Sequence, residues 1–218
     1  MQRQVRDALD RYFPLLLAII ATIGLLAMVD PGGWGAVLLV GAQSFTAMLA
    51  VSTSDSHPRT RRLVAITCGV ALVVVVAATV MNLPQLETFA YYVLMLVLVA
   101  IIPVAIARRL SQHRKVTIQT VVGAICIYLL VGLFFVVVAG AIQRITGIFF
   151  ADIGLARPSD FVYWSFITLS TVGYGDLVPG SDIARMVAIL EALIGQIYLV
   201  TVVALLVSNI SRTRREAD

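Results

Sequence analysis

Six long runs of apolar residues limit what this chain can fold into. They cover residues 12–29, 34–52, 63–81, 89–107, 116–141 and 183–210, and they are 18 to 28 residues long. The first five hold no charged residue, and the sixth holds only Arg185 and Glu191. A helix of about 20 apolar residues crosses a bilayer, and the runs lack the alternation of a membrane β-strand. The sequence therefore predicts an all-α membrane protein with six transmembrane helices.

The composition supports this prediction and excludes several classes of protein. Hydrophobic residues make up 60% of the chain and charged residues only 13%, whereas a soluble domain carries about 25% charged residues. A disordered chain, a nucleic-acid-binding module and an ordinary soluble enzyme are therefore excluded. The two cysteines lie inside apolar runs and make no disulfide or metal framework.

The basic residues are distributed unevenly, which predicts the orientation of the chain. If every run crosses the membrane once, 13 of the 16 lie on one side: Arg3, Arg6, Arg11, Arg59, Arg61, Arg62, Arg108, Arg109, Arg114, Lys115, Arg212, Arg214 and Arg215. By the positive-inside rule both termini are cytoplasmic, in a multi-pass protein of the cell membrane. Anionic lipid next to these loops accounts for the net charge of +4 without any nucleic acid.

The connection between the fifth and sixth runs, residues 142–182, is much longer than the other connections on its side. It contains a short apolar stretch at 161–169, which begins just after Pro158, Ser159 and Asp160. Either Ser159 or Asp160 can cap a helix there. Such a stretch is too short to cross a bilayer, so we expect a helix that enters the membrane and returns.

The short helix leads directly into Thr171, Val172, Gly173, Tyr174, Gly175 and Asp176. The two glycines permit backbone conformations that other residues avoid. Alternated with Val172 and Tyr174, they can turn successive carbonyls to the same side. Non-helical backbone at membrane depth survives only where it lines a cavity or is buried in protein. Carbonyl oxygens there can replace the water shell of a cation, and the motif holds no catalytic group, which argues against an enzyme.

In this motif the chain resembles the potassium channel family, with the specific match covering about residues 159–195. The resemblance implies a tetramer with four selectivity filters around one axis. In each subunit the filter follows the pore helix, which covers residues 163–170. It implies that the carbonyls of Thr171, Val172, Gly173 and Tyr174, with the Thr171 hydroxyl and the adjoining Gly175, form the ion-binding filter. The permeant K+ is then the ligand, and no other cofactor is expected. The intact Tyr174 favours potassium over sodium.

Four residues near the filter each have two interpretations. Tyr163 and Trp164 form either an aromatic cuff that holds Tyr174, which we favour, or an interfacial belt. Glu191 is a structural brace for the filter or a proton sensor, and we favour the brace. Gly195 falls where the family has a hinge glycine, and it is equally well a small residue for close helix packing. Asp176 extends the filter motif and is expected to support it.

We expect two domains, a four-helix transmembrane domain at 1–110 and a pore domain at 111–218. The first resembles a voltage-sensor domain, but its fourth run carries no arginine, and Arg108 and Arg109 follow only after it ends. Voltage sensing needs several charges per subunit. The sequence therefore predicts a passive, homotetrameric potassium channel with weak or no intrinsic voltage dependence.

Three other functions compete with this one. A non-selective cation channel is disfavoured by the intact Tyr174. A secondary transporter would often show internal repeats, and none pairs the first three runs with the last three. A regulatory membrane subunit that works only with a partner stays open.

Overall fold

The computed structural model describes residues 2–53, 58–110 and 118–215. Within these ranges the chain is all-α, apart from an isolated bridge between Phe150 and Pro179. The helices are α1 (Gln2–Met28), α2 (Trp34–Thr53), α3 (Pro58–Val80), α4 (Pro84–Leu110), α5 (Ile118–Thr146), α6 (Pro158–Leu169) and α7 (Asp182–Arg215). The predicted start of the fifth apolar run and the predicted domain boundary touch residues 111–117, which lie outside the described ranges.

Within the described ranges, five helical stretches are long and apolar enough to cross a membrane. They are Trp34–Thr53, Pro58–Val80, Pro84–Pro103, Thr120–Thr146 and Asp182–Val202. The apolar part of α1, Phe13–Met28, is shorter than these five. The structure thus confirms an all-α protein with several membrane-spanning helices, while a sixth crossing by α1 stays a prediction.

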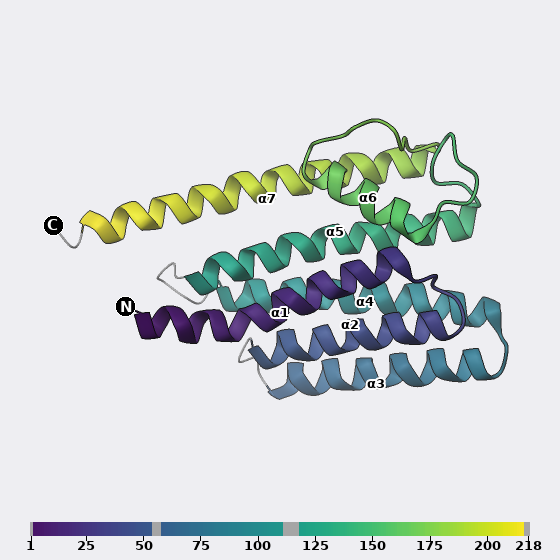
Figure 1. Cartoon of the computed structure of the whole chain (residues 1–218), viewed down its shortest axis with the longest axis horizontal. Helices are drawn as coiled ribbons and strands as arrows, with labels where there is room; N and C mark the ends of the chain where they lie inside the picture. Colours follow the sequence, from purple (N-terminus) through teal and green to yellow (C-terminus); the bar gives the residue numbers. More distant parts are fainter. Residues whose placement is uncertain (1, 54–57, 111–117, 216–218) are drawn as a thin grey trace.

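The long helices lie side by side, and both chain termini lie at the same end of the molecule (Figure 1). The last turns of α2 and α4 and the first turns of α3 and α5 lie at this end too, and the loops around α6 lie at the opposite end. Arg59 and Arg61 in the first turn of α3 and Arg109 near the end of α4 therefore sit at the end that holds the termini. This arrangement gathers the basic segments at one end, as the sequence predicts.

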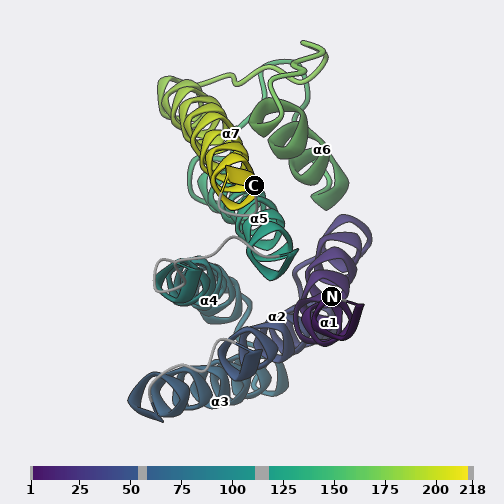
Figure 2. The ribbon, with the colours of Figure 1, turned by 90° about the vertical axis from the view of Figure 1, so that its left-hand side faces the viewer.

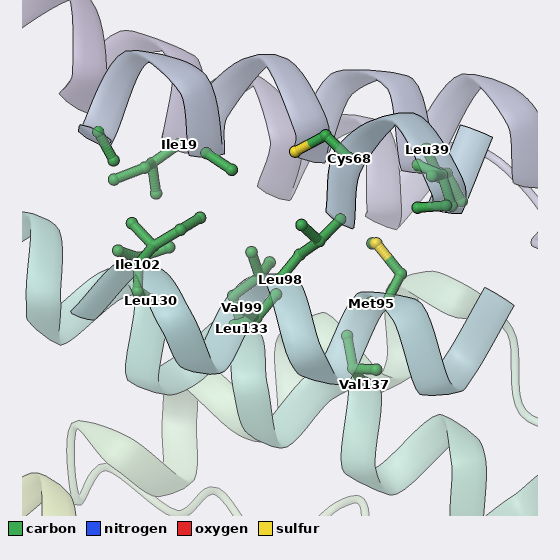
Figure 3. Packing of buried hydrophobic residues seen from close by; sticks show 14 of the residues in the cluster. Ile19, Leu39, Cys68, Met95, Leu98, Val99, Ile102, Leu130, Leu133 and Val137 are labelled. Carbon is green, nitrogen blue, oxygen red and sulfur yellow. The ribbon is translucent and has the colours of Figure 1, made fainter. Parts of the chain in front are cut away.

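Helix α5 joins the two halves of the molecule. Viewed along the long axis, it lies between α6 and α7 on one side and α4 on the other (Figure 2), and it contacts α1, α4, α6 and α7. One hydrophobic core spans α1 to α5, with Leu98 of α4 and Leu133 of α5 in the same cluster (Figure 3). The two domains that the sequence predicts therefore share a core, and the division near residue 110 stays a prediction.

A buried carboxylate ties together the loops at the filter end. Glu87, in the first turn of α4, is 7% exposed. Its Oε1 accepts a 2.5 Å hydrogen bond from the backbone N–H of Gly33, which precedes α2 directly. A negative group at a helix N-terminus is favoured by the helix dipole. Glu87 therefore fixes the α1–α2 turn against the start of α4.

Replacing Glu87 tests this link. We expect Glu87→Ala to lower the free energy of unfolding by about 2 kcal/mol, because the partly buried Gly33 N–H loses its acceptor. Glu87→Gln keeps an acceptor oxygen and should cause a clearly smaller loss. Unfolding of the purified variants in detergent, followed by circular dichroism, measures both. Equal stability of Glu87→Ala and the unaltered chain would contradict the link.

Candidate functional site

Helix α6 begins earlier than the sequence predicts, and it is capped differently. It starts at Pro158, whose fixed φ suits the first helical position. Ser159 and Asp160 lie inside the first turn, so the expectation that one of them is the N-cap is wrong. Arg157 is the N-cap, and its backbone N–H donates to Asp160 Oδ2 at 2.9 Å. The Arg157 guanidinium also lies 3.2 Å from Asp160 Oδ1.

The segment after α6 is fastened to the last turn of that helix. The backbone N–H groups of Val172 and Gly173 both donate to the carbonyl oxygen of Ile167, at 2.9 and 3.2 Å. The N–H of Thr171 donates to the carbonyl of Thr168 at 3.0 Å. These bonds use the orphan carbonyls of the helix end, so the helix and the strand that follows form one rigid unit.

The backbone of the predicted filter alternates in conformation. Thr171, Gly173 and Gly175 have φ angles of +61°, +52° and +79°, while Val172 and Tyr174 between them keep negative φ. Left-handed backbone suits the two glycines and is rare for a β-branched residue such as Thr171. Gly173 and Gly175 thus adopt the left-handed backbone that the sequence predicts glycine to permit in this motif, and Thr171 adopts it as well.

Tyr163 of α6 contacts the filter directly. Its ring stacks on that of Tyr174, with centroids 6.3 Å apart and planes 1° apart. Its hydroxyl donates to Asp176 Oδ2 at 2.8 Å, so the acceptor is Asp176 and not Tyr174. Partial desolvation, followed by the hydrogen bond to Asp176, raises the pKa of the Tyr163 phenol above its ordinary value. The phenol therefore keeps its proton at neutral pH and remains a donor.

Trp164 points away from the filter tyrosine. It is 2% exposed and packs in an aromatic cluster with Phe149, Phe150 and Phe161. Its ring centroid lies 4.8 Å from that of Phe149, in an edge-to-face arrangement. Sequence analysis missed Phe149 and Phe150, although adjacent aromatic residues in a long connection are a usable signal. Trp164 thus packs α6 against the loop that carries Phe149 and Phe150.

The loops on either side of α6 are joined by backbone hydrogen bonds. The N–H of Ala151 donates to the carbonyl of Val178 at 2.9 Å, and the N–H of Gly180 donates to the carbonyl of Phe149 at 2.8 Å. The chain before α6 and the chain after the predicted filter are therefore held together between the end of α5 and the start of α7.

Glu191 of α7 links all three pore helices. It is fully buried, and its Oε1 lies 2.5 Å from the hydroxyl of Ser165 in α6, which is also fully buried. The same hydroxyl lies 2.8 Å from the carbonyl oxygen of Gly132 in α5. A serine hydroxyl has one proton and cannot donate to both acceptors. Both contacts are satisfied when the Glu191 carboxyl carries a proton and donates to Ser165.

Gly195 and Tyr128 both meet α6 at its last residue, Leu169. A Cβ at Gly195 would lie 2.5 Å from the carbonyl oxygen of Leu169, so α7 needs glycine there for its close approach. The Tyr128 hydroxyl of α5 donates to the same carbonyl at 3.1 Å. Sequence analysis missed Tyr128, whose polar hydroxyl inside an apolar span was the available signal. Helix α7 continues through Gly195 without interruption.

Metal ligation by side chains has little support in this structure. Among the described residues, no three His, Cys, Asp or Glu side chains gather where they could hold a metal ion.

Parts of the chain are similar in sequence to known proteins. Residues 131–212, which cover about the second half of α5, all of α6, residues 171–175 and most of α7, match a family model described as "Ion channel". A "Putative potassium channel protein" from Rhodopseudomonas palustris is 37% identical over 59 residues, which cover 27% of this chain and 14% of that protein. No solved structure matches. Residues 131–212 therefore match an ion channel domain, and a stretch of 59 residues is similar to a protein named as a putative potassium channel.

Proposed function

We propose that the chain is a subunit of a homotetrameric channel that conducts K+ passively and selectively across the cell membrane. One observation carries the proposal. The non-helical segment at residues 171–175 alternates the sign of φ, and its first N–H groups are bonded to the end of a short helix between two helices that are long and apolar enough to cross a membrane.

The filter would bind K+ through its backbone. Carbonyls of Thr171, Val172, Gly173 and Tyr174, with the Thr171 hydroxyl and the flanking Gly175, would replace the water shell of the ion. The C-terminal end of α6 leads into this strand, and the negative end of a helix dipole favours a cation nearby. Both features support cation conduction and disfavour an anion pathway.

Assembly around an axis is supported by exposure. Residues 170–176 are exposed in the single chain, with Val172 at 53% and Tyr174 at 71%. An apolar valine and a tyrosine ring at membrane depth need a covering surface. One chain supplies carbonyls on one side of an ion only, so further copies would complete the coordination shell.

Selectivity for potassium is supported by the packing of Tyr174. Its ring stacks on Tyr163, whose hydroxyl is bonded to Asp176. This contact fixes the outer half of the filter to the first half of α6. A filter held at both ends favours a selective pore over the competing non-selective cation channel.

Weak voltage dependence is supported by the charges of α4. Arg108 and Arg109 stand together at one end of the helix, and Glu87 stands in the first turn at the other end. Residues 89–107 between them carry no charge. One charge moved through 100 mV contributes only about 2.3 kcal/mol, so this helix would respond weakly to the membrane potential.

The orientation is part of the proposal. The basic segments gather at the end that carries both termini, which favours a cytoplasmic location for that end. Basic side chains there, such as Arg59, Arg61 and Arg62, would lie close to anionic lipid head groups. The filter would then open to the outside.

Current through the purified protein tests the proposed function. In planar bilayers with opposed potassium and sodium gradients, we expect a reversal potential near the potassium equilibrium value. The conductance should change little with stepped voltage. A reversal potential near zero would contradict selectivity. A conductance that rises steeply with voltage would contradict the interpretation of α4.

Glu191 is expected to act as an uncharged brace. Glu191→Gln offers an amide donor and an acceptor at the same place, so the free energy of unfolding should stay within about 0.5 kcal/mol of the original. Glu191→Ala should lower it by about 3 kcal/mol, because it leaves a cavity and breaks the link to Ser165. Thermal unfolding in detergent measures both variants. If Glu191→Gln lowers the free energy of unfolding as much as Glu191→Ala does, the negative charge of Glu191 is required and the uncharged-brace interpretation is wrong.

Gly195 is expected to serve packing. Gly195→Ala should destabilise the purified protein by about 2 kcal/mol, since its Cβ would press on the Leu169 carbonyl. Gly69→Ala in α3 is the matched control, because its Cβ would meet nothing within 4 Å. Thermal unfolding compares the two. Unchanged stability of Gly195→Ala, together with an altered open probability, would favour the hinge interpretation instead.

A further inference from the structure

A cavity of about 350 Å³ lies where the first four helices meet the pore helices. It is lined by residues of α1, α4, α5 and α6, among them Tyr92, Gln143, Arg144 and Phe161. Gln143 is 6% exposed, and its Oε1 has no hydrogen-bond partner. A buried amide oxygen without a partner is costly, so this wall of the cavity lacks a hydrogen-bond donor.

A second cavity of about 510 Å³ lies between α4 and α5. It shares Tyr92 and Arg144 with the first, and its other lining residues include Phe89, Val93 and Leu96. Phe89 is 68% exposed and Val93 41% exposed, so this cavity is an open, largely apolar groove. From Pro84 to Leu96 the groove follows α4 for about 18 Å, at 1.5 Å per residue.

Arg144 stands at the junction of the two cavities, in the last turn of α5. Among the described residues its guanidinium makes no ion pair. The Tyr92 hydroxyl lies next to α5 one turn earlier, because a Cβ at Gly140 would be 3.1 Å from it. Two donors, Arg144 and Tyr92, and one acceptor, Gln143, thus line the same cavity. Asp30 lines the first cavity but not the groove. Because like charges repel, a negatively charged ligand group is expected on the groove side of the junction.

We propose that this junction binds one glycerophospholipid that has an anionic phosphate and a free headgroup hydroxyl. The phosphate accepts hydrogen bonds from Arg144 and Tyr92. The headgroup hydroxyl enters the first cavity and donates to Gln143 Oε1. One acyl chain lies in the groove along α4. The charge sits at the end of the helices and the apolar groove runs from it towards their middle, which is how a lipid is oriented in a bilayer. The site lies within one subunit and does not depend on potassium selectivity.

Native mass spectrometry of the purified full-length protein tests the site with three dioleoyl lipids. Phosphatidylglycerol has the charge and the hydroxyl, phosphatidylethanol has the charge alone, and phosphatidylcholine is zwitterionic. We expect binding to fall in that order. Gln143→Met should lower the affinity for phosphatidylglycerol by about threefold or more and leave the affinity for phosphatidylethanol unchanged. Arg144→Gln should lower the affinity for both anionic lipids by about tenfold.

Controls separate this site from general attraction. Arg185→Gln removes an exposed basic residue at the same end of the molecule and should leave all three affinities unchanged. Thermal unfolding should show that the variants are folded. Equal binding of the three lipids, an equal effect of Arg185→Gln, or an effect of Gln143→Met on phosphatidylethanol would overturn the proposal. Displacement of the lipid by soluble glycerol phosphate would overturn it too, because the acyl chain would then contribute nothing.

Discussion

The hydrogen bonds from the N–H groups of Val172 and Gly173 to the Ile167 carbonyl are the interaction on which the rest of the structure depends. They allow non-helical backbone to leave a helix end without unsatisfied amides. The surrounding elements then hold α6 in place. Ser165 connects it to α5 and α7, Trp164 packs behind it, and close approach at Gly195 positions α7 against its end.

The elements that the sequence predicts are those whose pattern lies within one continuous stretch of residues. Long uncharged runs specify helices, and two glycines alternating with Val172 and Tyr174 specify the filter backbone, so these features are visible in the sequence. The predicted start of α6 is wrong because an aspartate can accept helix-end N–H groups either as the N-cap or from inside the first turn, as Asp160 does. The local sequence does not distinguish these two positions. The shorter apolar part of α1 likewise leaves its crossing undecided.

Tertiary pairings could not be predicted, because partners far apart in sequence leave no local pattern. Ser165 and Glu191 are 26 residues apart, and Tyr128 and Leu169 are 41 apart. Tyr163 was expected to hold Tyr174, but folding brings Asp176 to its hydroxyl and places Tyr174 against its ring. The shared core also could not be foreseen. Leu98 and Leu133 lie in one cluster, so α4 and α5 belong to one hydrophobic core.

The central claim is that four copies of the strand at 171–175 surround ions with backbone carbonyls. A structure of the purified assembly with thallium in place of potassium tests it most directly. The account predicts anomalous density in a row on a fourfold axis, between the carbonyls of Thr171, Val172, Gly173 and Tyr174. An assembly of another symmetry, or an axis without density beside these carbonyls, would contradict it.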